Sequence, residues 1–214
     1  MAKTRLFMNR IIAIDGPVAS GKGTLAKKLA KFYGLPYLNT GGLYRAIGLH
    51  LLRNSIGDSL DKDKILVLMD GADFSNLDNP DLYAEEVSAI TSKIAVIPEV
   101  RKFLFNLQVD FANQDGGAVL DGRDIGTVIC PGASYKFFIM ASVEERARRR
   151  YRELLLRDKS IDYNEILSSL RERDRRDSER ADSPLKRAED AREVDTTSMG
   201  IDEVFSYVRS FIRF

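Results

Sequence analysis

Cysteine, histidine and tryptophan are nearly or wholly missing from this 214-residue chain, which has one Cys, one His and no Trp. The single Cys130 cannot form an intramolecular disulfide, and this favours a reducing compartment. His50 by itself cannot build a zinc site of ordinary ligand composition. We therefore expect a cytoplasmic protein in which both residues are ordinary structural side chains.

Long apolar runs and a strong net charge are also missing. No run approaches the roughly 18 apolar residues that a membrane-spanning helix needs, and residues 1–10 lack the apolar core of a signal peptide. The 33 basic and 32 acidic side chains leave a net charge of +1. This balance argues against binding to nucleic acid through overall electrostatic attraction, although it allows a local basic site. We expect a monomer with no membrane or nucleic-acid partner.

The apolar pattern alternates between strands and helices, and the hydrophobic content of 44% is enough for a substantial core. Short apolar runs predict strands near residues 11–15, 36–38, 118–121, 135–140 and 193–195. Helical patterns begin near residues 25, 40 and 143, and a last one covers 201–214. Such alternation predicts an α/β fold, a parallel sheet covered by helices on both faces with ligands at the carboxyl ends of the strands.

Two segments interrupt this alternation. Residues 57–97 are rich in Asp, Asn and Ser and are interpreted as an inserted lobe. Residues 144–192 are helical in pattern and densely charged. Apart from these segments, the chain is expected to form a single domain over residues 1–214.

The most informative segment is the loop Gly16–Thr24, of sequence GPVASGKGT, which follows the apolar run Ile11–Asp15 and precedes an amphipathic helix. This is the context in which a P-loop is credible. Glycines allow positive φ angles, so that successive N–H groups and the helix dipole can hold phosphate. Lys22 adds a cation that can reach terminal phosphates, which predicts a nucleoside triphosphate ligand. The alternative is a glycine-rich turn that carries a solvated lysine.

Phosphoryl transfer needs positive charge around the transferred group, and arginine binds phosphate through two parallel hydrogen bonds. Arg123 is the strongest candidate because it follows the predicted strand 118–121, at the ligand end of the sheet. Further candidates share a helical face with one another. Arg149 and Arg150 follow Arg146 by three and four residues, and Arg173 and Arg180 are seven residues apart. For any one arginine the alternative is an exposed charge paired with Asp or Glu, and the stretch 171–192 could be a helix held by salt bridges.

Five motifs follow one another along the chain: GPVASGKGT, NTGGLYR, DGRDIGT, EERARRR and RERDRRDSER. Their order and spacing resemble the bacterial cytidylate kinases, a family of nucleoside monophosphate (NMP) kinases, from Ile11 to about Phe211. A glycine after the P-loop lysine is usual in these kinases, so Gly23 supports the resemblance although it makes Thr24 an uncertain magnesium ligand. The resemblance implies phosphorylation of CMP and dCMP by ATP with bound Mg²⁺. It also implies that residues 57–97 are the NMP-binding lobe and that residues 144–182 include a short helical lid.

The resemblance further implies roles for individual residues. The ATP phosphates would be held by Gly16, Pro17, Val18, Ala19, Ser20, Gly21, Lys22, Gly23 and Thr24. CMP would be bound by Thr40, Arg45, Ser92, Arg101, Arg123, Asp124, Arg173, Asp177 and Arg180. The cations that assist transfer would be Lys22, Arg123, Arg149, Arg150 and Arg173. No residue is assigned as a metal ligand, and an ionised phosphate acceptor needs no general base.

Two other functions remain compatible with the sequence. Another small-molecule P-loop kinase, acting on UMP, AMP or a hydroxylated metabolite, would share the loop and differ at Thr40, Ser92 and Asp124. A P-loop switch or an ATPase with arginine-rich helices on RNA or DNA belongs to a different class. The balanced charge and the lack of an NKxD guanine motif argue against this last alternative.

Overall fold

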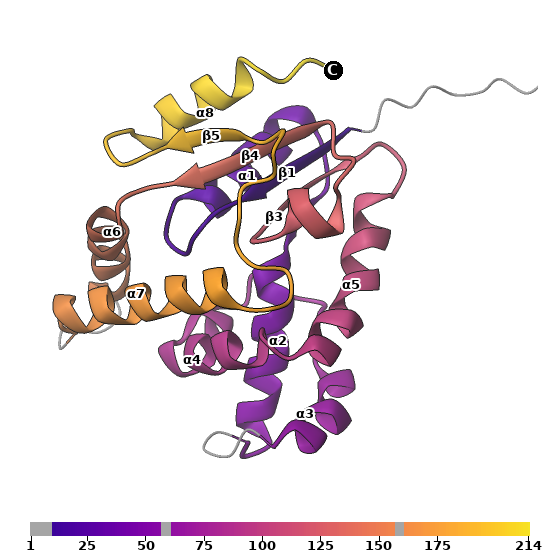
Figure 1. Cartoon of the computed structure of the whole chain (residues 1–214), viewed down its shortest axis with the longest axis vertical. Coiled ribbons are helices and arrows are strands. Elements are labelled where there is room, and N and C mark those ends of the chain that lie inside the picture. Colours follow the sequence, from indigo (N-terminus) through magenta and orange to yellow (C-terminus); the bar gives the residue numbers. More distant parts are fainter. Residues whose placement is uncertain (1–9, 57–60, 157–160) are drawn as a thin grey trace, which may run out of the picture. The chain divides into compact units, whose positions relative to one another are not determined.

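The computed structural model describes residues 10–56, 61–156 and 161–214, and Figure 1 shows its ribbon. The chain divides into two compact units, which we describe one at a time. Unit 1 consists of Met1–Leu38 and Phe111–Phe214, and unit 2 consists of Asn39–Asp110. Within the described ranges, every helix is too short or too polar to cross a membrane.

Unit 1 is built on a five-stranded sheet with the order β2-β3-β1-β4-β5. The strands are β1 (Ile11–Asp15), β2 (Tyr37–Asn39), β3 (Ala118–Gly122), β4 (Tyr135–Met140) and β5 (Arg192–Asp195). β1 pairs in parallel with β3 and with β4, and β4 pairs in parallel with β5. The predicted α/β fold with a parallel sheet is confirmed, and its strands lie where the apolar runs indicated.

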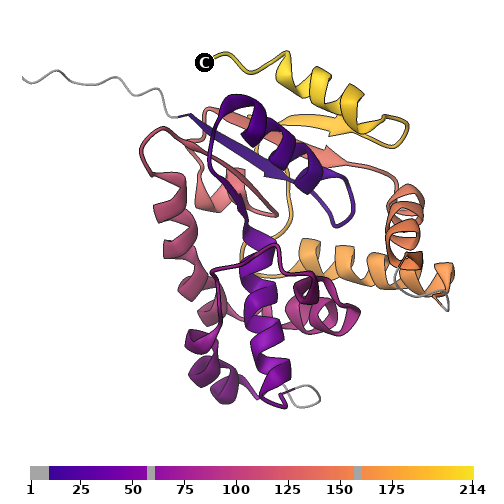
Figure 2. The ribbon, with the colours of Figure 1, turned by 180° about the vertical axis from the view of Figure 1, so that it is seen from behind.

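One face of the sheet carries the main core of unit 1. α1 (Lys22–Tyr33) and α8 (Ile201–Arg209) pack there against Ile12 and Ile14 of β1, and Figure 2 shows α1 in front of the strands. The prediction that the last helix continues to residue 214 is wrong. After Arg209 the backbone forms hydrogen bonds between residues three apart, as in a 3₁₀ turn. Phe211 N–H donates to the carbonyl of Val208, and Ile212 N–H donates to that of Arg209. Ile212 is still buried in the core.

On the opposite face, alternate side chains of the strands meet two other segments. Lys136 of β4 points there and donates to both carboxylate oxygens of Asp190, at 2.7 and 2.9 Å. Asp190 lies in the segment 180–191, which runs in front of the sheet in Figure 1. Asp15 of β1 points the same way and contacts the π-helical turn η3 (Ile125–Ile129).

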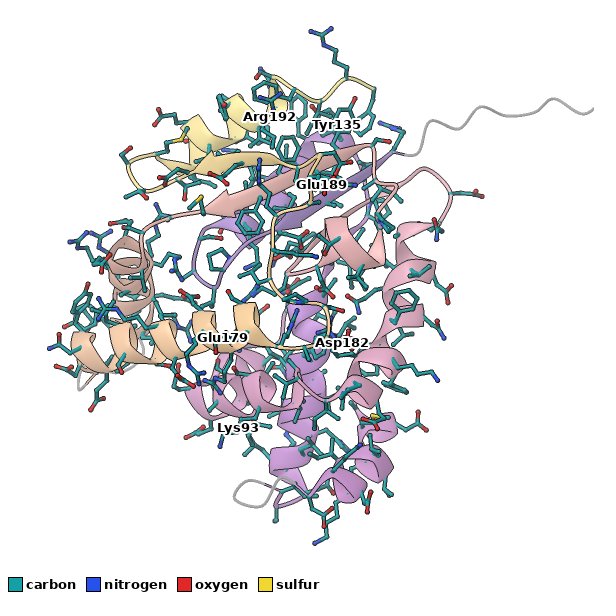
Figure 3. All side chains as sticks on the ribbon, viewed as in Figure 1. Lys93, Tyr135, Glu179, Asp182, Glu189 and Arg192 are labelled. Atoms are coloured by element: carbon teal, nitrogen blue, oxygen red, sulfur yellow. The ribbon has the colours of Figure 1, made fainter. Side chains whose placement is uncertain are left out.

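The charged region of unit 1 forms two helices, α6 (Val143–Leu155) and α7 (Tyr163–Glu179), which pack together around Ala147, Ile166 and Leu170. The expectation of a helical pattern as far as residue 192 is wrong, because α7 ends at Glu179. Figure 3 labels Glu179 near this end and Asp182 beyond it. The main-chain N–H of Leu185 turns back to the carbonyl of Asp177 at 2.7 Å, and Pro184 disfavours a helical conformation for the residue before it.

Unit 2 is helical. Its elements are α2 (Thr40–Arg53), α3 (Lys62–Leu68), η1 (Met69–Gly71), η2 (Pro80–Tyr83), α4 (Glu85–Ile94) and α5 (Pro98–Ala112). α2 begins at an Asn39 cap, whose side chain accepts from the N–H of Gly42 at 3.1 Å. The unit contains the described part of the segment 57–97 together with α2 and most of α5, while residues 57–60 lie outside the described residues. An NMP-binding role for the segment stays a prediction.

Candidate active site

The loop between β1 and α1 has the backbone conformation that the P-loop motif predicts. Gly16, Ala19 and Gly21 have φ angles of 152°, 59° and 87°, and α1 begins at Lys22. A Cβ atom at Gly16 would lie 2.0 Å from the carbonyl oxygen of Ile139, so no larger residue fits there. Positive φ angles before a helix turn main-chain N–H groups toward one concavity at the positive end of the helix dipole. The loop can therefore hold an anionic phosphate chain.

Lys22 is buried at the start of α1, and its Nζ donates to the carbonyl of Pro17 at 3.1 Å. Burial, and then the charges of Arg123 and Arg173, lower the pKa of Lys22 from 10.5 to about 7, against the attraction of Asp121 and Asp177. These interactions bring Lys22 together with three other predicted site residues, Arg123, Arg173 and Asp177. The cluster is rich in positive charge, as a site for phosphate groups requires.

Arg123 and Asp177 form the best-defined ion pair in this cluster. The Nε of Arg123 donates to Oδ2 of Asp177 at 2.8 Å, and its Nη1 donates to the carbonyl of Gly122 at 3.2 Å. Burial raises the pKa of Asp177, but Arg123, Arg173 and Arg180 outweigh it and keep the pKa below its usual value. Arg180 itself donates from Nε to the carbonyl of Ser183 at 2.7 Å. Asp177 is therefore an ionised carboxylate that orients the Arg123 side chain.

α7, which covers the first part of the stretch 171–192, presents different side chains on its two faces. On the exposed face Arg175 pairs with Glu172 at 2.9 Å and with Glu179 at 2.8 Å, as in a helix held by surface salt bridges. On the other face Arg173 and Asp177 join the cluster around Lys22. Surface salt bridges therefore account for the exposed face of α7, while a site role for Arg173 and Asp177 on the other face stays a prediction.

Arg146 joins α6 to α7 and to the P-loop. Its two terminal nitrogens donate to the two carboxylate oxygens of Asp174, at 3.0 and 2.6 Å. Nη1 also donates to the carbonyl of Val18 at 3.3 Å. The bidentate pair thus joins α6 to α7, and the bond to Val18 attaches α6 to the phosphate-binding loop.

Arg149 and Arg150 of α6 have different surroundings, although both are predicted lid residues. Arg149 contacts the P-loop, because its Nη1 lies 3.4 Å from the carbonyl oxygen of Ser20. Arg150 pairs with Glu153 on its own helix at 3.1 Å. The structure therefore brings Arg149 into direct contact with the predicted ATP-binding loop.

A cavity of about 470 Å³ opens beside the P-loop. Its walls come from Ser20, Gly21 and Thr24, from Arg149 of α6, and from the segment 196–201 between β5 and α8. The cavity lies entirely in unit 1 and has room for an organic group next to the phosphate-binding loop.

Four predicted CMP-binding residues belong to unit 2, and all four side chains are buried: Thr40, Arg45, Ser92 and Arg101. Arg45 lies within α2 and donates from Nη1 to the carbonyl of Leu82 at 2.9 Å and to the hydroxyl of Ser88 at 2.7 Å. Arg101 donates from Nη1 to the carbonyl of Ala95 at 3.3 Å. Two arginines with fixed orientations are suited to binding an anion or a polar base.

Two buried carboxylates at strand ends, Asp15 and Asp121, are not among the predicted site residues. Asp15 accepts from the N–H groups of Ile125 and Gly126, both at 2.8 Å, and burial raises its pKa to about 7 against these hydrogen bonds. Asp121 accepts from the Tyr37 hydroxyl at 2.6 Å, and burial raises its pKa against the attraction of Lys22. A signal was available, because each is an acidic residue that ends an apolar strand of a parallel sheet.

Comparisons with known proteins agree with this geometry. A family model described as cytidylate kinase matches residues 12–213. A cytidylate kinase of Brucella suis biovar 1 (strain 1330) is 47% identical over 205 residues, which cover 94% of this chain and 92% of the relative. One of Bartonella tribocorum (strain CIP 105476 / IBS 506) is 46% identical over 202 residues, 94% of each. A solved structure, an uncharacterized protein from Eubacterium ventriosum ATCC 27560, has a TM-score of 0.51 at 16% identity, over 94% of this chain and 97% of that one, and is similar in fold alone.

Proposed function

Because the chain belongs to the cytidylate kinase family, we propose that it transfers the γ-phosphoryl group of ATP to CMP and dCMP, forming CDP and dCDP. The observation that carries the proposal is the P-loop with Lys22 in a cluster with Arg123, Arg173 and Asp177. Transfer between two phosphate groups requires little covalent chemistry from a protein. It requires that two anionic nucleotides be held in place and that charge on the transferred group be stabilised.

On the ATP side, the N–H groups of Gly16–Thr24 would hold the phosphates and the Lys22 ammonium would neutralise charge on the transferred group. The cavity between the P-loop and the segment 196–201 would take the adenosine part of ATP. Arg149 lines this cavity, and Arg150 and Arg173 are proposed to approach the transferred group. The region 144–182, apart from residues 157–160, which lie outside the described residues, would act as the lid.

On the CMP side, Thr40, Arg45, Ser92 and Arg101 of unit 2 are proposed to contact the nucleotide, with residues 57–97 as the NMP-binding lobe. Arg123, Asp124, Arg173, Asp177 and Arg180 of unit 1 would also contact it. Carboxylate, hydroxyl and guanidinium groups match the donor and acceptors of cytosine. A site of buried polar groups discriminates strongly, since the wrong base leaves those groups unpaired.

Mg²⁺ would enter as the complex with ATP. The hydroxyl of Thr24 in the P-loop and the carboxylate of Asp121, which lies next to Gly23, are hard oxygen donors of the kind that Mg²⁺ binds. One or two protein oxygens suffice, because phosphates and water complete the coordination. Bound there, the ion would offset the negative charge of the phosphates. We also propose a monomer in the cytoplasm, consistent with a single cysteine that is buried and free.

A panel of acceptors tests the proposal. CMP, dCMP, UMP and AMP are each offered with ATP and Mg²⁺, and ADP formation is followed by a coupled assay. We expect turnover with CMP and dCMP to exceed that with UMP and AMP. Lys22→Ala should retain the fold and lose turnover by about two or more orders of magnitude, because it removes electrostatic stabilisation. Activity on AMP alone, or near-normal turnover of the Lys22→Ala variant, would contradict the proposal.

A further inference from the structure

Thr196 lies where the P-loop, β4 and α6 meet, and the proposed function gives its hydroxyl no role. It follows β5 directly, and its main-chain N–H donates to the carbonyl of Met140 at the end of β4, at 2.8 Å. Only 2% of the residue is exposed. The backbone pairing and the burial hold the side chain in one place beside the P-loop.

The hydroxyl of Thr196 makes contacts with all three elements. It lies 3.1 Å from the carbonyl oxygen of Ser20 in the P-loop and 3.1 Å from that of Met140. It also accepts from Nη1 of Arg149 on α6, at 3.1 Å. A hydroxyl has one hydrogen and two lone pairs, so it can donate to one carbonyl while it accepts from the guanidinium. A single side chain thus connects the P-loop to α6.

The guanidinium of Arg149 is held in a fixed plane by this arrangement. Its Nη2 donates to the main-chain carbonyl of Thr196 at 2.5 Å, and its Nε donates to Glu145 at 3.2 Å. Nη1 also lies 3.7 Å from the position that a Cβ atom would take on Gly21. The plane of the guanidinium therefore forms part of the wall of the 470 Å³ cavity beside the P-loop.

We propose that Thr196 is a positioning residue for ATP, whose hydroxyl holds the guanidinium of Arg149 against Ser20 of the P-loop. This role rests on the proposed function in one respect, because it takes the cavity beside the P-loop as part of the ATP site. Thr196 itself acts through Arg149 and the loop. Thr196 should consequently increase the affinity of the protein for ATP and leave its affinity for CMP unchanged.

Two variants separate the hydroxyl from the rest of the side chain. Thr196→Val is isosteric and removes only the hydroxyl, while Thr196→Ser keeps it. For Thr196→Val we expect the KM for ATP to rise about tenfold or more, since the Arg149 guanidinium and the Ser20 carbonyl each lose one hydrogen-bond partner. The KM for CMP should stay within about twofold of the original value, and Thr196→Ser should stay close to the original for both substrates. Thermal unfolding of each variant shows that the protein is folded.

A double-mutant cycle with Arg149→Ala tests the route of the effect. If Thr196 acts through Arg149, Thr196→Val changes ATP affinity far less in the Arg149→Ala background than in the original protein. The proposal would be overturned if the effects of Thr196→Val and Arg149→Ala on ATP affinity were fully additive. It would also be overturned if Thr196→Val left the KM for ATP unchanged, or if Thr196→Ser raised this KM as much as Thr196→Val does. Titration calorimetry with a non-hydrolysable ATP analogue measures the same affinities without CMP. If the protein showed no turnover with CMP, the proposed function would be contradicted. The role of Thr196 in ATP binding could still be tested by these affinities.

Discussion

Lys22, Asp15 and Asp121 change their acid–base behaviour because the fold buries them at the ends of strands or at the start of α1. Burial raises the pKa of both carboxylates and lowers that of Lys22 to about 7. For Lys22 the folded-state pKa lies below the ordinary value of 10.5. Its contribution to the free energy of unfolding therefore increases as the pH rises from about 7 to 10.5.

The shifted pKa of Lys22 predicts that ATP binding takes up a proton. Phosphate charges next to the amine favour its ammonium form, so the pKa should rise when ATP binds. At a pH of about 8, above the lowered value near 7, part of the Lys22 population is neutral before binding and becomes protonated. Titration calorimetry of ATP in two buffers with different ionisation enthalpies measures this uptake.

The matched control for the proton uptake is Lys22→Met, which keeps the length of the side chain and removes the amine. The dependence of the binding enthalpy on buffer should disappear in this variant. Equal enthalpies in both buffers for the original protein would show that Lys22 is already an ammonium ion before ATP arrives.

At the scale of elements, the helices α6 and α7 carry many charged side chains, but only a few contacts between the two helices hold them together. The apolar contact between them is small, centred on Ala147, Ile166 and Leu170. The buried Arg146 adds a bidentate pair with Asp174, at 2.6 and 3.0 Å. Exposed pairs such as Arg175 with Glu172 contribute little, because water screens them.

This difference predicts how the two kinds of pair respond to substitution. Asp174→Asn removes the charge that compensates Arg146, and we expect a local loss of about 2 to 4 kcal/mol in the stability of the α6–α7 pair. Hydrogen exchange followed by mass spectrometry should show faster exchange in both helices. Glu172→Gln on the exposed face of α7 is the control and should leave exchange unchanged. Equal effects of the two substitutions would show that the partly buried pair of Arg146 with Asp174 stabilises the helices no more than an exposed pair does.

At the scale of the whole molecule, the charge balance decides which partners attract the chain. The 33 basic side chains are matched by 32 acidic ones, and several arginines pair with acidic side chains of the same unit. A nucleic-acid binder that works by counterion release needs unmatched positive charge. The arginine series therefore fits small phosphorylated ligands better than a polyanion.

We accordingly predict no substantial binding to DNA or RNA at about 0.15 M salt and micromolar protein. Fluorescence anisotropy with a labelled duplex and a labelled RNA strand, at two salt concentrations, measures this. Tight binding that weakens steeply with salt, in a protein without CMP-dependent turnover, would favour the nucleic-acid ATPase instead.

The predictions from sequence succeeded where local pattern dominates. Ile11–Asp15 and the glycines of the P-loop specify a strand, a loop with positive φ and a helix start through short-range sterics. The end of α7 was predicted less well, because charge periodicity continues past Glu179 while a hydrogen bond from Leu185 to Asp177 ends the helix. That bond depends on how the following segment folds back.

The fold class, the P-loop and the resemblance to cytidylate kinases follow from the amino-acid sequence alone, since each depends on motifs whose residues are near neighbours along the chain. The surroundings of single side chains, by contrast, depend on the three-dimensional packing of the chain. This packing placed Thr196 next to Ser20 and Arg149, and it buried Asp15 against a turn more than 100 residues away. Residues distant in sequence meet only when the parallel sheet brings the ends of its strands to one edge. Which of them touch depends on register and packing, which no local pattern encodes.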